Sequence, residues 1–185
     1  MLLVDVDGGL ALRARASARD REHLVVAGDG SRHRVWLNPQ HGGWLTGLAE
    51  QFDVVWATGW EHDAPRLLGD LLGVPDFAVL EFTERPSVGV RFSKLGDVRA
   101  LVGDRPVAWV DDDLGPEVLA WAAARIEPTL LVQPSASEGL RIEHVNELNV
   151  FARSLTIDGA ARDAPNASNA CGTGVEPSDE RRDGE

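Results

Sequence analysis

Short apolar runs, each bounded by polar or turn residues, recur along the first two-thirds of the chain, at residues 2–6, 53–57, 77–82, 107–110 and 129–132. Such runs are typical of strands that are buried on both faces of a parallel sheet. Segments with apolar residues at helical spacing predict helices at 42–51, 61–72, 94–102, 116–126 and 143–153. Strands that alternate with helices predict an α/β fold, with a central parallel sheet in a three-layer α/β/α, Rossmann-like arrangement.

Two segments depart from this alternation. Residues 23–28 and 33–37 are β-rich and separated by turn residues, which predicts a β-hairpin soon after the first strand. After about residue 156 the sequence turns polar and rich in Gly, Asn and Ser. We therefore expect one domain over residues 1–155 and a disordered acidic, polar tail over 156–185.

Composition narrows the possible functions. The 185 residues carry a net charge of −12, which argues against a large nucleic-acid footprint but leaves a local basic groove open. The single cysteine, Cys171, excludes a disulfide framework and a thiolate metal site. No apolar run reaches the ~18 residues of a membrane helix, and the apolar opening is too short for a secretory signal. We expect a cytoplasmic protein without a membrane partner.

Two carboxylates follow the first expected strand, in the segment Asp5-Val6-Asp7-Gly8. Because side chains alternate along an extended chain, Asp5 and Asp7 are expected on the same side. Gly8 lets the backbone turn sharply behind them. Such a pair also occurs in calcium loops and in metal-dependent sugar transferases, so alone it does not establish catalysis.

Three consecutive acids, Asp111, Asp112 and Asp113, follow the fourth expected strand. Like charges this close are costly unless a cation lies among them. With Asp5 and Asp7, two of these acids would form an oxygen-rich pocket for Mg²⁺. The alternative is an acidic loop before a helix N-terminus, which accounts well for Asp113 and poorly for Asp111.

The second expected strand ends at Thr58, followed by Gly59 and Trp60. A hydroxyl and free backbone N–H groups at this position can bind a phosphoryl oxygen. The alternative for Thr58 is a helix N-cap. Trp60 is a candidate for stacking on a base, with packing as its alternative.

Lys94 is the only lysine among the 18 Lys and Arg residues, and it begins an expected helix between the third and fourth strands. A compact ammonium there would neutralise phosphate charge. The alternative is a solvated surface lysine.

The order Asp-x-Asp-Gly, Thr, Lys, Asp-Asp over residues 1–133 resembles the four signature motifs of the haloacid dehalogenase (HAD) superfamily. More narrowly, the segments LLVDVDG, RVWLNP, VVWATGW, AWVDDD and LLVQP resemble the HAD domain of Swiss-army-knife RNA repair proteins. The resemblance implies a HAD fold with the hairpin as a flap after strand one. Neither inserted segment is long enough for a cap domain of ~50 residues, so only a minimal cap is expected.

The resemblance also implies a mechanism. Asp5 would attack phosphorus and form an aspartyl-phosphate, and Asp7 would act as acid and then base. Thr58 and Lys94 would bind the transferred phosphoryl group. Mg²⁺ would be bound by Asp5, the backbone carbonyl of Asp7, Asp111 and, through water, Asp112. Gly59 and Trp60 would contact the substrate.

Several functions remain open at this point. The first is a phosphatase of nucleic-acid ends or nucleotides in RNA repair, which needs a basic strip near Trp60, Arg91 and Lys94. The second is a small-metabolite phosphatase, and the third a non-catalytic HAD-like binding or scaffold module. The five histidines show no metal-ligand spacing, although His62 is close enough to Thr58 to touch a substrate. Substrate identity, oligomeric state and the role of the tail are not indicated.

Overall fold

A five-stranded parallel sheet forms the centre of the protein. The computed structural model describes residues 1–84 and 93–162, with side chains described through residue 157. The sheet has the order β6-β5-β1-β7-β8. Its strands are β1 (Leu2–Val4), β5 (Val54–Trp56), β6 (Ala78–Val79), β7 (Val107–Val110) and β8 (Thr129–Val132). The prediction of an α/β, Rossmann-like architecture is confirmed.

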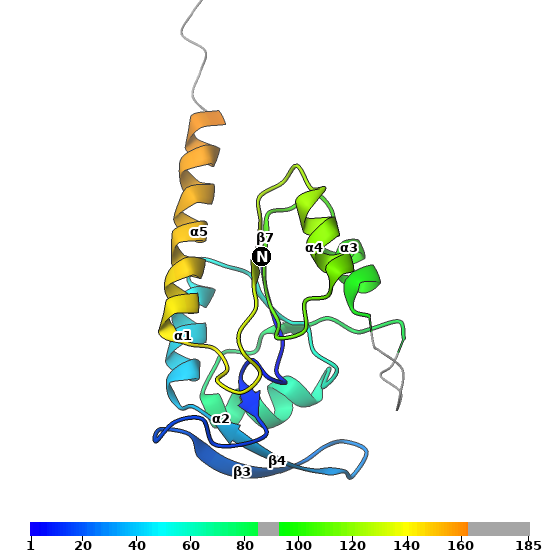
Figure 1. Cartoon of the computed structure of the whole chain (residues 1–185), viewed down its shortest axis with the longest axis vertical. Helices are drawn as coiled ribbons and strands as arrows, with labels where there is room; N and C mark the ends of the chain where they lie inside the picture. The colour runs from blue at the N-terminus through cyan, green and yellow to red at the C-terminus, as the bar shows by residue number, and fades with distance from the viewer. Residues whose placement is uncertain (85–92, 163–185) are drawn as a thin grey trace, which may run out of the picture.

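Helices cover both faces of this sheet (Figure 1). On one face lie α1 (Gln40–Ala49) and α5 (Ile142–Arg162), and on the other α3 (Leu95–Val102) and α4 (Pro116–Ala123). Alternating residues of β1 serve the two cores: Leu2 and Val4 pack with the α1 and α5 side, and Leu3 with the α3 and α4 side. Both sides of the strand are therefore buried, as its unbroken apolar run predicts.

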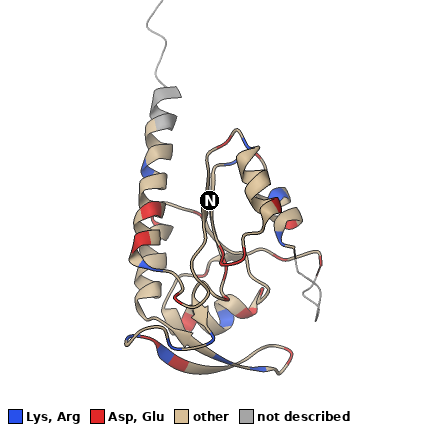
Figure 2. Cartoon of the chain, viewed as in Figure 1, with Lys and Arg blue, Asp and Glu red and all other residues tan. Residues whose placement is uncertain are grey.

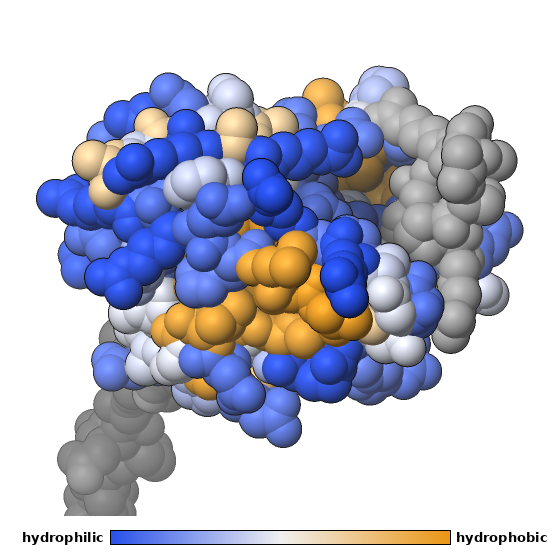
Figure 3. All heavy atoms as spheres, turned by 90° about the horizontal axis from the view of Figure 1, so that it is seen from below, coloured by the Kyte–Doolittle hydropathy of each residue, from blue (hydrophilic) through white to orange (hydrophobic). Residues whose placement is uncertain are grey.

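A second, antiparallel sheet lies beyond the carboxyl ends of the parallel strands (Figure 1). Its order is β2-β4-β3, with β2 (Ala11–Leu12), β3 (Arg21–Val26) and β4 (Arg32–Leu37). The predicted hairpin is confirmed, with β2 as an additional strand. Leu24 and Val26 are exposed on β3. From this end of the molecule, Figure 3 shows a patch of hydrophobic residues among hydrophilic ones.

Three elements differ from the sequence prediction. The helix expected at 61–72 begins only at a π-helical segment, η1 (Ala64–Gly69), with a proline in its first turn, and continues as the short α2 (Asp70–Leu72). The strand expected at 77–82 is reduced to β6. The last helix continues to Arg162, beyond the domain boundary expected at residue 155. Residues 163–185 of the predicted tail lie outside the described residues.

No helix in the described part of the chain has both the length and the apolar composition needed to cross a membrane.

Two neighbouring glycines of α1 allow a matched test of packing. A Cβ on Gly42 would lie 1.8 Å from the Leu72 carbonyl oxygen, whereas a Cβ on Gly43 would meet nothing within 4 Å. We expect Gly42→Ala to lower the free energy of unfolding by about 2–4 kcal/mol, because backbone cannot yield to the methyl group. Gly43→Ala should instead raise it by about 0.5–1 kcal/mol through helix propensity. Urea unfolding of both variants measures the difference, and equal effects would refute this helix contact.

Candidate active site

The site lies where the order of the parallel strands reverses. Counted along the chain, the strands run outward from β1 through β5 to β6 on one side, and from β7 to β8 on the other. Open α/β sheets bind ligands at such a switch point, outside the carboxyl ends of the strands. Asp5 follows β1 and Asp111 follows β7. Their backbone N–H groups donate to Val110 O at 2.9 Å and to Val132 O at 3.1 Å, which fixes both residues at the sheet edge.

The side chain of Lys94 joins these two carboxylates. Its Nζ lies 2.8 Å from Asp5 Oδ1 and 2.8 Å from Asp111 Oδ2, and its side chain is only 14% exposed. Lys94 immediately precedes α3, so the start of that helix sets the position of the ammonium. The alternative of a solvated surface lysine is wrong, because the ammonium is enclosed by the carboxylates that the sequence placed at the same strand ends.

One ammonium does not balance the negative charge around it. Burial raises the pKa of Asp5 to about 7, with Lys94 opposing the shift and Asp111 adding to it. Burial and the charge of Asp111 also raise the pKa of Asp112. Burial alone would lower the pKa of Lys94, but the two carboxylates outweigh it and raise the pKa. Lys94 is therefore charged, and the cluster favours any further positive charge, whether a proton or a metal cation.

Three of the carboxylates fit a metal ion. Oxygen atoms of Asp5, Asp111 and Asp112 all lie within 4.8 Å of one another. Carboxylate oxygens are the ligands that Mg²⁺ and Ca²⁺ prefer. Gly8 allows this packing, because its φ is +66° and a Cβ there would lie 2.3 Å from the Asp112 carboxyl carbon. The sharp turn expected at Gly8 thus also makes room for a candidate metal ligand.

Asp7 lines the same cleft as Asp5 but is exposed. The indole Nε1 of Trp60 donates a hydrogen bond to Asp7 Oδ2 at 2.9 Å. On the side of the hairpin, the rings of Trp60 and His33 lie 5.0 Å apart, measured between centroids, and are tilted by 54°. Trp60 therefore connects the hairpin to Asp7, a contact that the sequence did not indicate.

Thr58 follows β5, as expected, but its side chain is fully buried. Its hydroxyl oxygen accepts from Trp60 N at 3.4 Å, and its carbonyl accepts from Glu61 N at 3.0 Å. These two hydrogen bonds close a turn, and Thr58 is not a helix N-cap, because the helical segment that follows begins at Ala64 with Asp63 as its N-cap. Gly59 lines the cleft with the acids, whereas Thr58 does not. His62 is paired with Glu81 at 2.7 Å and lines a neighbouring hollow instead.

The cleft, of about 410 Å³, includes residues that sequence reasoning missed: Arg13, Ser93, Trp109, Glu117 and Val118. Acids dominate its wall, and Arg13 and Lys94 are the cations among its lining residues. Figure 2 shows acidic residues in the loops near this edge of the sheet and both signs of charge along the hairpin. Nothing in the local sequence marks Arg13, because only the return of β2 alongside β4 brings it here.

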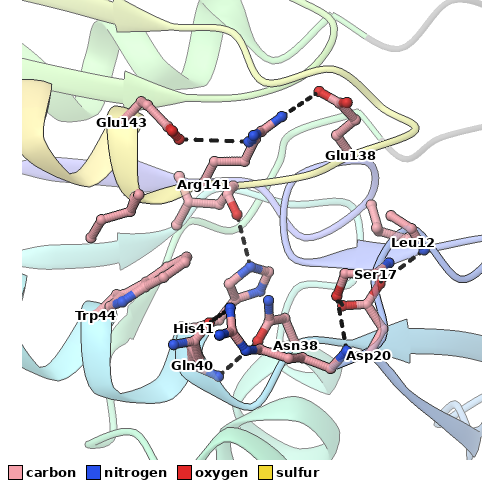
Figure 4. Close-up of a pocket in the computed structure, with 14 residues that line it drawn as sticks. Leu12, Ser17, Asp20, Asn38, Gln40, His41, Trp44, Glu138, Arg141 and Glu143 are labelled. Atoms are coloured by element: carbon pink, nitrogen blue, oxygen red, sulfur yellow. Dashed lines mark hydrogen bonds and ion pairs between the residues drawn. The ribbon is translucent and has the colours of Figure 1, made fainter.

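A second cavity, of about 490 Å³, lies between α1, the segment before β3 and the start of α5 (Figure 4). His41 is buried in its wall, and its Nε2 lies 3.0 Å from the Leu140 carbonyl oxygen. Leu140 N in turn donates to Gly9 O at 2.7 Å. Arg141 is held between Glu138 and Glu143. Through Leu140, this cluster holds the turn that follows Asp5 and Asp7.

Comparisons with models of protein families and with curated proteins found no match to this chain.

The raised pKa of Asp5 predicts how the metal-free protein responds to pH. Since the folded pKa is about 7 and the ordinary value 3.8, ionising Asp5 costs stability progressively as pH rises from about 4 through 7. Asp5→Asn cannot ionise there. We expect this variant, in chelator at pH 8, to exceed wild type by about 2–4 kcal/mol in the free energy of unfolding, with a smaller gain at pH 5.

Urea titrations at the two pH values measure this gain. Asp76→Asn, at an exposed position, is the control that should change stability little at either pH. An Asp5→Asn protein that is less stable than wild type at pH 8 would contradict the charge imbalance described for the cluster.

Proposed function

We propose that this chain is a Mg²⁺-dependent phosphohydrolase of the HAD type that acts through an aspartyl-phosphate at Asp5. The observation that carries the proposal is the Lys94 ammonium, 2.8 Å from both Asp5 and Asp111 at the switch point of the sheet. A scaffold module has no need to bury two carboxylates and an ammonium, since such groups are costly to desolvate. A site that binds a cation and an anion together does need buried groups of both charges.

The two carboxylates of the first motif differ in a way that suits two roles. Asp5 is buried and ion-paired, so it is held in one position as a nucleophile requires. Asp7 is exposed in the same cleft, and the Trp60 indole N–H engages one of its oxygens. Its other oxygen has no such partner from Trp60 and is the one assigned to the leaving group.

In the first half-reaction a carboxylate oxygen of Asp5 attacks phosphorus, and the bond from phosphorus to the leaving oxygen breaks. Protonated Asp7 gives its proton to that oxygen. In the second half-reaction Asp7 takes a proton from water, whose oxygen attacks phosphorus. The Asp5 carboxylate and inorganic phosphate are then released.

Asp5, Asp111 and Asp112 would hold Mg²⁺, together with the Asp7 backbone carbonyl that the HAD resemblance adds. Bound there, the ion supplies positive charge that lets an anionic carboxylate approach an anionic phosphate. Lys94 stabilises charge on the transferred phosphoryl oxygens. The proposed contact of Thr58 with the same group draws support from its position after β5, next to β1, and requires its hydroxyl to be freed from Trp60 N.

The charges near the cleft bear on the substrate. Arg91, part of the basic strip required for the RNA-repair alternative, lies outside the described residues. A hollow beside Asp7 contains Arg13, Arg32 and Arg34. Three arginines next to an acidic cleft are a small positive surface, so a small phosphomonoester or the last nucleotides of a chain fits better than a long nucleic-acid footprint.

Hydrolysis of p-nitrophenyl phosphate tests the function directly. We expect turnover that depends on Mg²⁺ and is abolished in Asp5→Asn, because no aspartyl-phosphate can form without the nucleophile. Asp76→Asn, exposed and away from the cleft, should retain wild-type rates. Absence of turnover in folded, Mg²⁺-loaded wild type, with this substrate and with a panel of phosphomonoesters, would favour the scaffold alternative.

Asp7→Asn separates acid/base catalysis from metal binding. The variant keeps Asp5, Asp111 and Asp112, so Mg²⁺ should still raise its melting temperature. Its kcat should fall by about 10²–10⁴, the usual contribution of general acid–base catalysis. Thermal unfolding with and without Mg²⁺, beside steady-state kinetics, measures both. A variant with kcat near the wild-type value would remove Asp7 from the mechanism.

A further inference from the structure

We propose that the antiparallel sheet provides a second anion site, formed by Arg13 after β2 and Arg32 of β4 beside Asp7, which selects phosphomonoesters whose leaving group carries another phosphate or carboxylate. This inference rests on the proposed function, because it says which residues bind the leaving group in that same cleft.

The position of Asp7 identifies this side. As the proposed acid, Asp7 lies next to the leaving oxygen, so the remainder of the substrate extends past Asp7 and away from Asp5. A hollow of about 390 Å³ opens there, between Asp7, Trp60 and the strands β2 and β4. Its lining includes Arg13, Arg32 and Arg34 and no carboxylate other than Asp7.

Two of these arginines are not engaged elsewhere. Arg34 is paired with Glu22 at 2.9 Å. Across the described residues, neither Arg13 nor Arg32 has an ion pair or a side-chain hydrogen bond. Guanidinium groups bind phosphate and carboxylate in bidentate fashion. Unpaired arginines beside an acidic cleft thus have donors available for an anion of the substrate.

The charges of the main cleft also indicate that a second anion binds outside it. Its lining carries six acids, namely Asp5, Asp7, Asp111, Asp112, Asp113 and Glu117, against two cations. Lys94 is paired with Asp5 and Asp111 and is assigned to the transferred phosphoryl group, so it is not available to a second anion. A second anionic group would be repelled within this cleft, so it can bind only where positive charge is in excess, which is the hairpin side.

An aromatic wall adjoins the arginines. Trp60 and His33 line the same hollow, with their ring centroids 5.0 Å apart. A flat ring in the leaving group could stack here, since ring stacking contributes affinity without specific hydrogen bonds. The shared chemistry is the second anion, which a nucleoside bisphosphate and a sugar bisphosphate both provide.

Calorimetric titration in Mg²⁺ tests the site, using Asp7→Asn protein so that turnover is slow. Adenosine 3′,5′-bisphosphate is compared with adenosine 3′-phosphate and adenosine 5′-phosphate, and fructose 1,6-bisphosphate with fructose 6-phosphate. We expect each bisphosphate to bind at least about tenfold more tightly than its monophosphates. Adding Arg13→Gln or Arg32→Gln should reduce this ratio to about twofold or less. Adding Arg21→Gln, on β3 and outside the hollow, should leave the ratio unchanged.

The outcomes separate this inference from the proposed function. If both bisphosphates are preferred and both arginine variants abolish the preference, the second anion alone accounts for it. If only the adenosine bisphosphate is preferred, the aromatic wall contributes as well. A ratio near one for both pairs overturns the inference, even if wild type hydrolyses p-nitrophenyl phosphate. Equal weakening of mono- and bisphosphate by Arg13→Gln also overturns it, by assigning Arg13 to the transferred phosphoryl group. If wild type shows no turnover but the ratio still depends on Arg13, the anion site stands and the phosphatase function does not.

Discussion

One ammonium shared by two buried carboxylates is the constraint on which the site depends. Asp5 and Asp111 are adjacent because β1 and β7 are neighbours in the sheet, and desolvated carboxylates this close repel each other. Lys94 offsets that repulsion at 2.8 Å from each. Lys94 is the residue before the first turn of α3, so the start of that helix holds the ammonium in this position. With Asp112 alongside, the cluster remains negative, and its three carboxylates are placed so that they could hold a metal ion.

The hairpin is held to this cluster through the segment that follows β5. Asp63 accepts from Gly28 N at 2.8 Å, and Arg66 donates to Val26 O at 3.1 Å, so the tip of the hairpin is tied to η1. Trp60, from the same segment, donates to Asp7. The side of the cleft next to Asp7 is therefore built by one connected unit, and a displacement of the hairpin would also move the partner of Asp7.

The sequence predicted the parts of the site that local pattern controls. Apolar runs located the strands, and acids at their ends located Asp5 and Asp111, since parallel strands bring their carboxyl ends to one edge. Because Lys94 is the only lysine in the sequence, it was predicted as a site residue. Arg13 and the contact between Trp60 and Asp7 escaped prediction, because they depend on how β2 pairs with β4 and how the segment after β5 folds back. The two-residue β2 is too short to give any periodic signal.

The proposed binding of a phosphate in this acidic cleft depends on the metal. Six acids against two cations repel a phosphate dianion, so the affinity of the metal-free cleft for phosphate must be low. Each carboxylate that repels phosphate also attracts the cation. Linkage is reciprocal, so a bound cation that raises the affinity for phosphate has its own affinity raised by the same factor when phosphate is present. The excess of acids thus disfavours binding of the anion alone and favours binding of the metal and the anion together. A site with balanced charges would not make binding of the anion depend on the metal in this way.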